Sequence, residues 1–267
     1  MTTFLWGTSR LLDQRIIEGE RMVRAAGDLL KRHFQGSVEI RQKSAIDLVT
    51  SADLAAERLI MGRISNHFPE DSVIAEESGA RRGSSAYTWV VDPLDGTTNF
   101  AHGMPHFAVS VGLQHEHKIV SGWVFDPMKD ELFEAHLGFG ARCNRQPIGT
   151  KLRFSLAECL CVSGFPYDRR ERLDHLLERV KKALMHCRGF RRLGAASLDL
   201  AYVAAGRLDI YWEDGLKPWD MAAGWLIAAE AGAQVTRLNG TSFDLYDGQV
   251  LAAHPNVLAS FVEQVLT

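Results

Sequence analysis

The segment from Thr88 to Phe100 constrains the fold of this chain more than any other part of its sequence. It reads Thr-Trp-Val-Val-Asp-Pro-Leu-Asp-Gly-Thr-Thr-Asn-Phe, so a short apolar run ends in two aspartates three residues apart. The apolar run predicts a short buried strand. Asp92 and Asp95 then emerge at its end, where irregular backbone leaves side chains free to converge. Pro93 stiffens the turn between them because its φ is fixed. The pattern predicts a place to hold metal ions.

The turn after Asp95 offers backbone amides to an anion. Gly96 lacks a Cβ and reaches torsions that other residues avoid, so the amides of Gly96, Thr97 and Thr98 can point outward at a phosphate. A plain polar turn is the alternative for an isolated Asp-Gly pair. Other segments of the chain complement this turn, and together they favour a metal and phosphate site.

The turn resembles the first signature of the inositol monophosphatase family, and three further segments match that family's motifs in the same order: Lys43–Asp53, Ala75–Ser78 and Glu213–Gly224. The likeness runs from about residue 11 to the C-terminus. Three stretches are most similar to the bacterial, inositol-1-monophosphatase-like branch: Lys217–Trp219, Ser163–Pro166 and Arg192–Tyr202. The wider superfamily also contains fructose-1,6-bisphosphatases, histidinol-phosphate phosphatases and nucleotide 3'-phosphatases, so the substrate stays open.

Phosphatases of the haloacid dehalogenase type also carry an apolar strand followed by aspartates, in the pattern Asp-x-Asp-Gly-Thr. Their two aspartates lie two residues apart, whereas Asp92 and Asp95 lie three apart. A covalent phosphoaspartate mechanism is therefore disfavoured.

The composition is ordinary for a soluble globular protein: 267 residues, 46% hydrophobic and 24% charged. The net charge of -3 gives no general attraction to nucleic acid or to an anionic membrane. No apolar run approaches the roughly 18 residues of a membrane span. The first ten residues lack a signal-peptide core, so the cytoplasm is the expected compartment. Four cysteines without CxxC spacing indicate ordinary thiols.

Hydrophobic periodicity predicts helices over residues 11–34 and 54–67, followed by successive strands over 107–114, 118–126 and 131–135. After about residue 159 it predicts helices over 169–186, 195–205 and 221–231, strands over 208–212 and 250–253, and a terminal helix from 255. Such blocks indicate layered sheets covered by helices.

The resemblance implies an α+β fold, the layered αβαβα sandwich of the inositol monophosphatase and fructose-1,6-bisphosphatase type. Residues 1–150 would form an N-terminal α+β half with most metal ligands. Residues 151–267 would form a C-terminal α/β half with the substrate side and one ligand, and the two halves would pack as one compact unit.

The resemblance also implies two or three Mg²⁺ ions per site, which suits a chain rich in carboxylates at these positions. Glu76, Asp92 and the carbonyl of Leu94 would bind the first ion. Asp92, Asp95 and Asp220 would bind the second, so that Asp92 bridges the pair. From local sequence alone, Asp220 could instead be a plain helix N-cap.

Lys43 and Asp47 match the family's loop near a third metal position. One residue fewer separates them than in the animal enzymes, which makes this loop the least secure part of the resemblance.

The catalytic residues implied are Thr97, Asp53, Glu76 and Glu77. Thr97 would orient the attacking water, with Asp53 as its hydrogen-bond partner, because a hydroxyl is a weak base unless an acceptor fixes its proton. Glu76 would act on the same water as a metal ligand. Glu77 would lie behind the metal ligands, near that water. A plain N-cap role for Asp53 is the alternative.

The substrate-side residues implied are Asp95, Gly96, Thr97, Gly194, Ala195, Ala196, Glu213 and Asp220. The amides of Gly96 and Thr97 would cradle the phosphate, and Glu213 would accept from a polyol hydroxyl. Ala195 and Lys217 stand where animal members often carry Thr and His, so the substrate rim departs from the animal pattern.

The chain is thus expected to be a Mg²⁺-dependent, lithium-sensitive phosphomonoesterase that hydrolyses inositol monophosphate or a related small polyol or sugar phosphate through metal-activated water. A homodimer is expected because relatives commonly form one. The alternatives are a sister phosphatase activity or an additional, non-enzymatic role as an accessory factor of RNA polymerase or RNA, which the net charge does not support.

Overall fold

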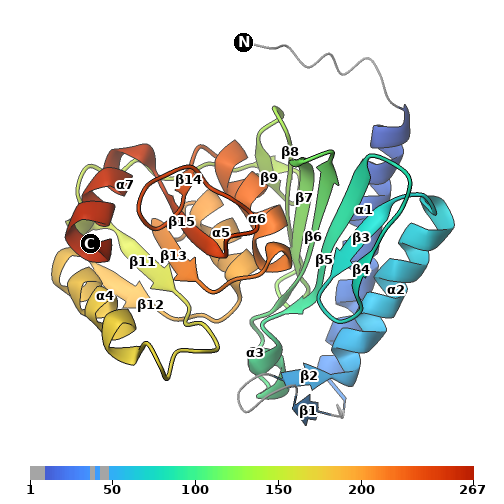
Figure 1. Ribbon diagram of the computed structural model, residues 1–267, viewed down its shortest axis with the longest axis horizontal. Coiled ribbons are helices and arrows are strands. Elements are labelled where there is room, and N and C mark those ends of the chain that lie inside the picture. Colours follow the sequence, from blue (N-terminus) through green and yellow to red (C-terminus); the bar gives the residue numbers. More distant parts are fainter. Residues whose placement is uncertain (1–9, 37–39, 43–47) are drawn as a thin grey trace.

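The structure is a computed structural model that describes residues 10–36, 40–42 and 48–267. Its helices and sheets alternate in five layers, two helical layers outside, two sheets, and a helical layer between the sheets (Figure 1). The predicted αβαβα sandwich is therefore confirmed. No helix of the described residues is long and apolar enough to cross a membrane.

The first sheet has eight strands in the order β10-β9-β8-β7-β6-β5-β3-β4. Its strands are β3 (Ser72–Ala75), β4 (Gly79–Arg81), β5 (Tyr87–Asp95), β6 (Ala108–His115), β7 (Lys118–Asp126), β8 (Glu131–His136), β9 (Ala141–Cys143) and β10 (Gln146–Pro147). The strands from β5 to β10 form an antiparallel meander, while β3 runs parallel to β5. This parallel pair brings the end of β3, where Glu76 follows, beside the middle of β5.

Two long helices, α1 (Arg10–Phe34) and α2 (Ser51–His67), cover one face of this sheet. They bury apolar side chains such as Met22 and Ile60 against Trp89 and Trp123 of the strands, all of them fully buried. A short ribbon, β1 (Ile40–Gln42) and β2 (Leu48–Thr50), precedes α2. This core fixes α2 against the strand that carries the two aspartates.

The middle layer consists of α5 (Ala196–Ala204) and α6 (Pro218–Glu230), whose residues are buried on nearly every side. Such all-round apolar helices belong between two sheets. At Gly122 a Cβ would lie 2.8 Å from the backbone oxygen of Ala223, so β7 needs glycine where α6 approaches it. The helix starts of this layer face the pocket described below.

The second sheet has five strands in the order β12-β11-β13-β15-β14. They are β11 (Leu160–Ser163), β12 (Gly189–Arg191), β13 (Ile210–Asp214), β14 (Gln234–Thr236) and β15 (Gln249–Ala253). Its outer face packs on α4 (Leu173–His186), α7 (Pro255–Phe261), the single-turn 3-10 helix η1 (Leu156–Glu158) and the terminal π-helix η2 (Val262–Leu266). The division into two halves near residue 150 stays a prediction.

Several boundaries predicted from the sequence are wrong. The strand predicted at Trp89 runs on through Asp95, with a register shift between Asp92 and Asp95, so both aspartates belong to β5. The helix predicted from Arg169 begins at Leu173. The helix predicted from Met221 begins at Pro218, because proline suits the first helical position.

Candidate active site

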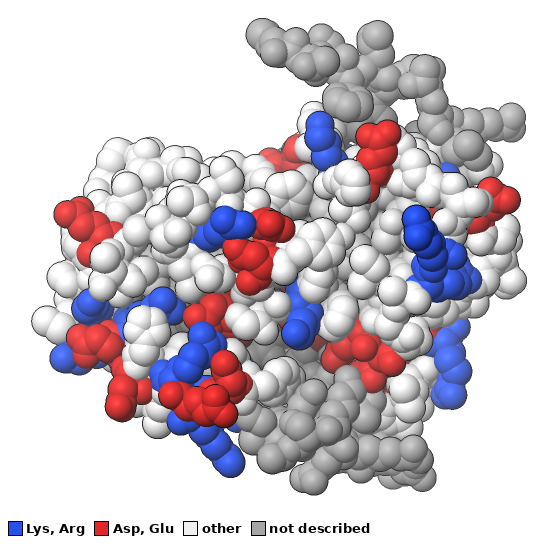
Figure 2. Space-filling model, viewed as in Figure 1, with Lys and Arg blue, Asp and Glu red and all other residues white. Residues whose placement is uncertain are grey.

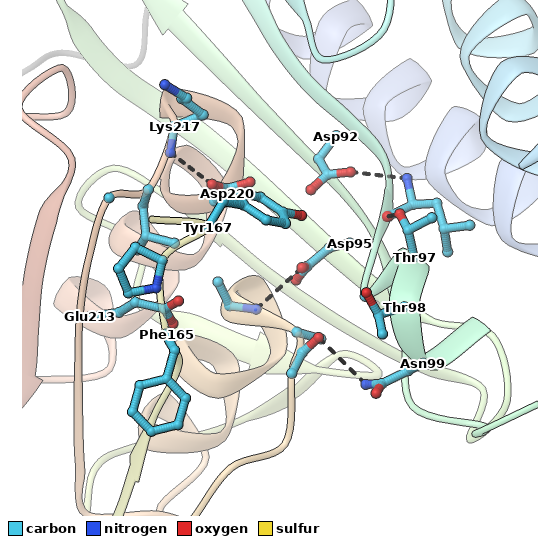
Figure 3. A pocket seen from close by; sticks show the side chains of 18 of the residues that line it. Asp92, Asp95, Thr97, Thr98, Asn99, Phe165, Tyr167, Glu213, Lys217 and Asp220 are labelled. Atoms are coloured by element: carbon cyan, nitrogen blue, oxygen red, sulfur yellow. Dashed lines mark hydrogen bonds between the residues drawn. The ribbon is translucent and has the colours of Figure 1, made fainter. Parts of the chain in front are cut away.

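A pocket of about 780 Å³ opens where the end of β5 meets the starts of α5 and α6. The side chains of Asp92, Asp95, Thr97, Glu213 and Asp220 surround it in the close view (Figure 3). All predicted site residues line it except Asp53, which lies behind Thr97, and the two loop residues Lys43 and Asp47. Those two lie outside the described residues.

The irregular end of β5 positions the two aspartates. The ladder with β6 loses its register between Asp92 and Asp95, which frees the intervening backbone to turn. The Leu94 amide donates to Asp92 Oδ1 at 3.0 Å. Asp92 and Asp95 are only 2% and 8% exposed. The strand therefore buries both carboxylates at the floor of the pocket.

Asp95 is hydrogen-bonded to the start of α5, about a hundred residues further along the chain. Its Oδ2 accepts from the amide and the hydroxyl of Ser197 at 2.7 and 2.5 Å, and its Oδ1 accepts from the Ala196 amide at 3.2 Å. A carboxylate is favourable there because the first amides of a helix lack partners and carry positive charge. The sequence analysis did not single out Ser197, since no local pattern connects it to β5.

Asp220 and Asp53 occupy the same position in two different helices. Asp220 is the third residue of α6 and accepts the Lys217 amide at 2.7 Å. Asp53 is the third residue of α2 and accepts the amide of Thr50, the N-cap, at 2.9 Å. The N-caps are Thr50 and Lys217, so the N-cap position considered for both aspartates is wrong, while a role confined to the helix start stays the alternative. The third position still leaves one oxygen of each carboxylate for other partners.

Neighbouring carboxylates of the pocket raise the pKa of Asp92 and of Asp220. Burial raises the pKa of Asp92 well above its usual range, and the charges of Glu76, Asp95 and Asp220 raise it further. Burial also raises the pKa of Asp220, with Asp95 and Glu76 adding to it, although the bond from the Lys217 amide opposes the rise. Burial likewise raises the pKa of Asp95, against its hydrogen bonds to α5. The group is an acidic site whose charge a cation would neutralise.

The donor set fits hard cations such as Mg²⁺, which prefer carboxylate and carbonyl oxygen. Among the described residues no three His, Cys, Asp or Glu side chains stand close enough to form a closed metal site. The carboxylates would therefore have to draw together around an ion. An ion among these donors would relieve the repulsion that raises the pKa of Asp92 and of Asp220.

Thr97 and Asp53 are in contact. The Thr97 hydroxyl lies 3.0 Å from Asp53 Oδ1 and 2.9 Å from the Leu94 carbonyl, and its one proton serves one acceptor at a time. Asp53 is fully buried, and its Oδ2 also accepts from the Thr50 hydroxyl at 2.5 Å. Burial raises the pKa of Asp53, while its bonds to Thr50 and Thr97 lower it. The geometry allows Asp53 to fix the direction of the Thr97 hydroxyl.

The loop after β3 carries Glu76 and Glu77 into the pocket wall. The Glu76 amide bonds the Val91 carbonyl at 3.2 Å, and the Glu77 amide bonds Glu57 Oε2 at 2.9 Å. Glu57 lies one helical turn after Asp53 on α2 and is only 4% exposed. The sequence analysis missed Glu57, although spacing of four on a buried helix face would have pointed to it.

Glu213 lies on β13 at the opposite side of the pocket. Burial raises its pKa to about 7, while the Tyr211 hydroxyl, which donates at 2.9 Å, and the charge of Arg192 oppose the rise. Asp199 of α5 is a neighbouring carboxylate that the sequence analysis missed. It is 1% exposed, and no described residue is a hydrogen-bond partner of its Oδ1. Burial raises its pKa well above the usual range, with Glu213 and Asp95 adding to it.

Comparison with known proteins identifies the family. The model of the inositol monophosphatase family matches residues 12–266. This chain belongs to the inositol monophosphatase family. The protein named Nus factor SuhB of Escherichia coli K12 is 41% identical over 249 residues, 91% of this chain and 92% of that protein.

Solved structures of the family have the same fold. The extragenic suppressor protein suhB of Bartonella henselae matches with a TM-score of 0.90 and 36% identity, over 94% of this chain and 98% of that one. The inositol monophosphatase of Anabaena (Nostoc) sp. PCC 7120 matches with a TM-score of 0.87 and 38% identity, over 96% of both chains.

Within this inositol monophosphatase fold, the Gly194 loop meets the turn after β5. Gly96 and Gly194 have φ angles of 92° and 90°, which favour glycine. The Asn99 side chain of α3 (Thr97–Ala101) donates to the carbonyls of His106 and Leu193, both at 2.9 Å. Asn99 therefore ties the two loops together, a role that the sequence analysis missed. The roles predicted for Gly194, Ala195 and Ala196 stay predictions.

Proposed function

We propose that this chain is a Mg²⁺-dependent phosphomonoesterase acting on inositol monophosphate or a related small polyol or sugar phosphate. The observation that carries the proposal is the group of Glu76, Asp92, Asp95 and Asp220 in one pocket, where burial and the neighbouring carboxylates raise the pKa of Asp92 and of Asp220. Membership of the inositol monophosphatase family supports a phosphatase. Mg²⁺, held by these carboxylates and the Leu94 carbonyl, would supply the positive charge that activates water and stabilises the reacting phosphate.

Thr97 would orient the attacking water in this proposal. When the Thr97 hydroxyl donates its hydrogen bond to Asp53, the lone pairs of the hydroxyl oxygen are free to accept a hydrogen bond from water in the pocket. A water molecule held this way points its own lone pair in a fixed direction, and orientation lowers the barrier to attack. The Glu57 carboxylate accepts from the Glu77 amide and would thereby help to keep Glu77 in place near this water.

The substrate would span the pocket from the turn after β5 to β13. The amides of Gly96 and Thr97 would receive the phosphate, and Glu213 would accept a hydroxyl of the leaving group. A carboxylate with a pKa of about 7 is half ionised at that pH and mostly ionised above it. Recognition of the hydroxyl through Glu213 would therefore strengthen as pH rises through 7.

A phosphate-release screen tests the function. The panel contains inositol 1-phosphate, fructose 1,6-bisphosphate, histidinol phosphate, a nucleoside 3'-phosphate and phenyl phosphate, each with Mg²⁺ or with EDTA. We expect release with Mg²⁺ from at least one of them, and its loss in Asp92→Asn. Absence of Mg²⁺-dependent release from every compound would overturn the proposal.

A second candidate function is an accessory role at RNA polymerase, favoured by the name Nus factor SuhB that several relatives carry. Acidic and basic side chains are interspersed on the face drawn in Figure 2. Capture of RNA polymerase from a lysate, by wild type and equally by Asp92→Asn, would support a role independent of catalysis. Failure of both to capture it would remove this candidate.

A further inference from the structure

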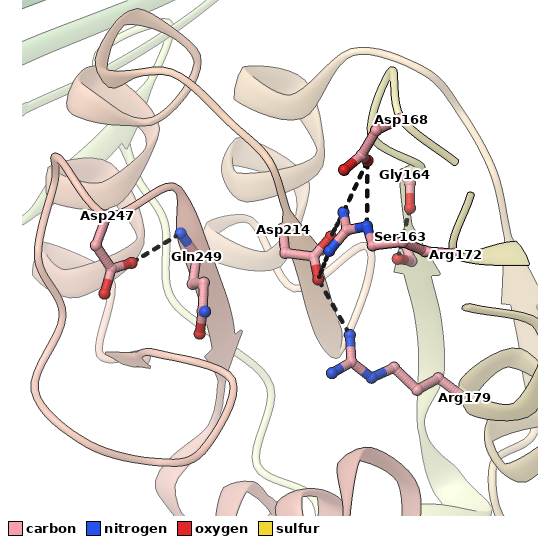
Figure 4. Close-up of polar contacts among 8 residues, drawn as sticks. All are labelled: Ser163, Gly164, Asp168, Arg172, Arg179, Asp214, Asp247 and Gln249. Atoms are coloured by element: carbon pink, nitrogen blue, oxygen red, sulfur yellow. Dashed lines mark hydrogen bonds and ion pairs between the residues drawn. The ribbon is translucent and has the colours of Figure 1, made fainter. Parts of the chain in front are cut away.

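Asp214 follows Glu213 on β13 and pairs with two arginines, Arg172 just before α4 and Arg179 within it (Figure 4). Its Oδ1 accepts from Arg172 Nη2 at 2.9 Å, and its Oδ2 accepts from Arg172 Nη1 and Arg179 Nη1, both at 3.3 Å. Arg172 also donates to Asp168 at 3.0 Å. We call Asp168, Arg172, Arg179 and Asp214 the Asp214 cluster. It joins the end of β13 to the first half of α4.

The centre of the cluster is shielded from water. The side chains of Asp214 and Arg179 are 11% and 14% exposed, compared with 36% for Arg172 and 53% for Asp168. Arg179 Nε is buried, and no hydrogen-bond partner for it lies among the described residues. Arg179 therefore depends on Asp214 for its counter-charge, and a buried guanidinium without one is costly. Asp214 is the residue that holds the cluster together.

The cluster anchors the segment that connects β11 to α4. Phe165, Pro166, Tyr167 and Arg169 of this segment line the substrate pocket, and the segment ends at Arg172. It leaves β11 at Gly164, so one end is fixed by the sheet and the other by Asp214. Residues 164–172 thus form a pocket wall that is attached at both ends.

This wall packs directly against Glu213. A Cβ on Gly164 would lie 2.1 Å from both oxygens of the Glu213 carboxylate, and a Cβ on Gly215 would lie 2.6 Å from Pro166. A void of about 10 Å³ behind the wall is bordered by Glu213, Asp214 and Arg179 together. A shift of the Asp214 cluster would therefore move the wall relative to the carboxylate on the substrate side.

We propose that Asp214 is a positioning residue for substrate selection. Through Arg172 and Arg179 it fixes residues 164–169 against Glu213, and this fixed wall decides which leaving groups fit. The proposal rests on the proposed phosphatase function. Asp214 does not act on the phosphate, because it is not among the residues that line the pocket with Asp92, Asp95 and Asp220.

Kinetics of Asp214→Asn test the selection. We expect the KM for the preferred hydroxyl-bearing substrate to rise about tenfold, within the roughly 10²-fold cost of misplacing a positioned group. The kcat on phenyl phosphate, which offers Glu213 no hydroxyl, should stay within about twofold, because a loosened wall leaves the reacting centre intact. Equal losses on both substrates, or no change on either, would overturn the proposal.

Tryptic cleavage at Arg169 and Arg170 tests the anchoring without any activity. We expect Asp214→Asn to be cut there about tenfold faster than wild type, because cleavage follows the population of the released segment. The matched control is Glu131→Gln, which removes the Glu131–Arg207 pair, 20% and 39% exposed, far from this wall. The control should be cut at the wild-type rate.

A second variant guards against misfolding. If Asp214→Asn does not fold, Arg172→Gln removes the more exposed arginine and should show both effects in weaker form, and Arg172→Lys should restore part of them. Unchanged cleavage in a folded Arg172→Gln would refute the anchoring. If wild type releases no phosphate, the proposed function fails, and the tryptic result still decides whether Asp214 anchors the wall.

Discussion

Glu213→Gln should make the metal-free protein more stable at alkaline pH. Burial raises the pKa of Glu213 from its ordinary value of 4.5 to about 7 in the folded state. The folded protein therefore binds this proton more tightly than the unfolded chain does. Between these two pKa values the free energy of unfolding falls as pH rises, since the unfolded state has already released the proton.

The size of the effect follows from the distance between the two pKa values. At about 1.36 kcal/mol for each pH unit, the step from 4.5 to about 7 corresponds to about 3 kcal/mol as an order of magnitude. The penalty is absent below pH 4.5 and complete above pH 7. Glutamine has no proton to lose, and its oxygen can still accept from the Tyr211 hydroxyl. The variant should avoid most of the penalty.

Urea unfolding at pH 5 and pH 8, with EDTA present, measures the difference. We expect Glu213→Gln to exceed wild type by up to about 3 kcal/mol at pH 8 and by much less at pH 5. Glu178→Gln is the control, because that side chain is 49% exposed and pairs with Lys181 at the surface. A Glu213→Gln protein no more stable than wild type at pH 8 would refute the reasoning.

Three further predictions concern the reaction. Thr97→Ala should lower turnover by about 10²–10⁴-fold; Asp53→Asn should act in the same direction, and fully additive losses in the double variant would contradict a shared role. Asp220→Asn should keep the wild-type circular dichroism and lose nearly all turnover, so near-normal turnover at saturating Mg²⁺ would remove Asp220 from the ligand set. Millimolar Li⁺ should inhibit turnover by competing with Mg²⁺ at Asp95 and Asp220. An equal Na⁺ titration that gives the same inhibition curve would refute this competition.

Local patterns predicted the fold well where one element carries its own signal. The meander of β6, β7 and β8 followed from alternation and short turns, and α1 from its apolar stripe. Helix starts were harder. The start of α6 was placed three residues late, because Pro218 and Trp219 looked like the end of an irregular segment. The short strands β4, β9, β10, β12 and β14 have two or three residues each, too few to show a period.

The residues of the candidate site also divide into those that local sequence predicts and those that it does not. The turn after β5 was visible because its residues are contiguous. The bonds from Ser197 to Asp95 and from Asn99 to Leu193 join residues about a hundred positions apart, and no local pattern carries them. Asp199 and Asp214 look like ordinary polar residues in the sequence, and only packing reveals that one is buried and the other paired with two arginines.

The hydrogen bonds that Asp95 accepts from α5 also decide how its two oxygens are used. Oδ2 receives two donors from Ser197, which occupy both of its lone pairs, while Oδ1 receives one donor from Ala196. Only Oδ1 has a lone pair left for another partner. An ion at Asp95 would thus share a carboxylate that also joins β5 to the start of α5. A fragment ending near residue 150 would keep Asp95 and lose the donors that orient its carboxylate.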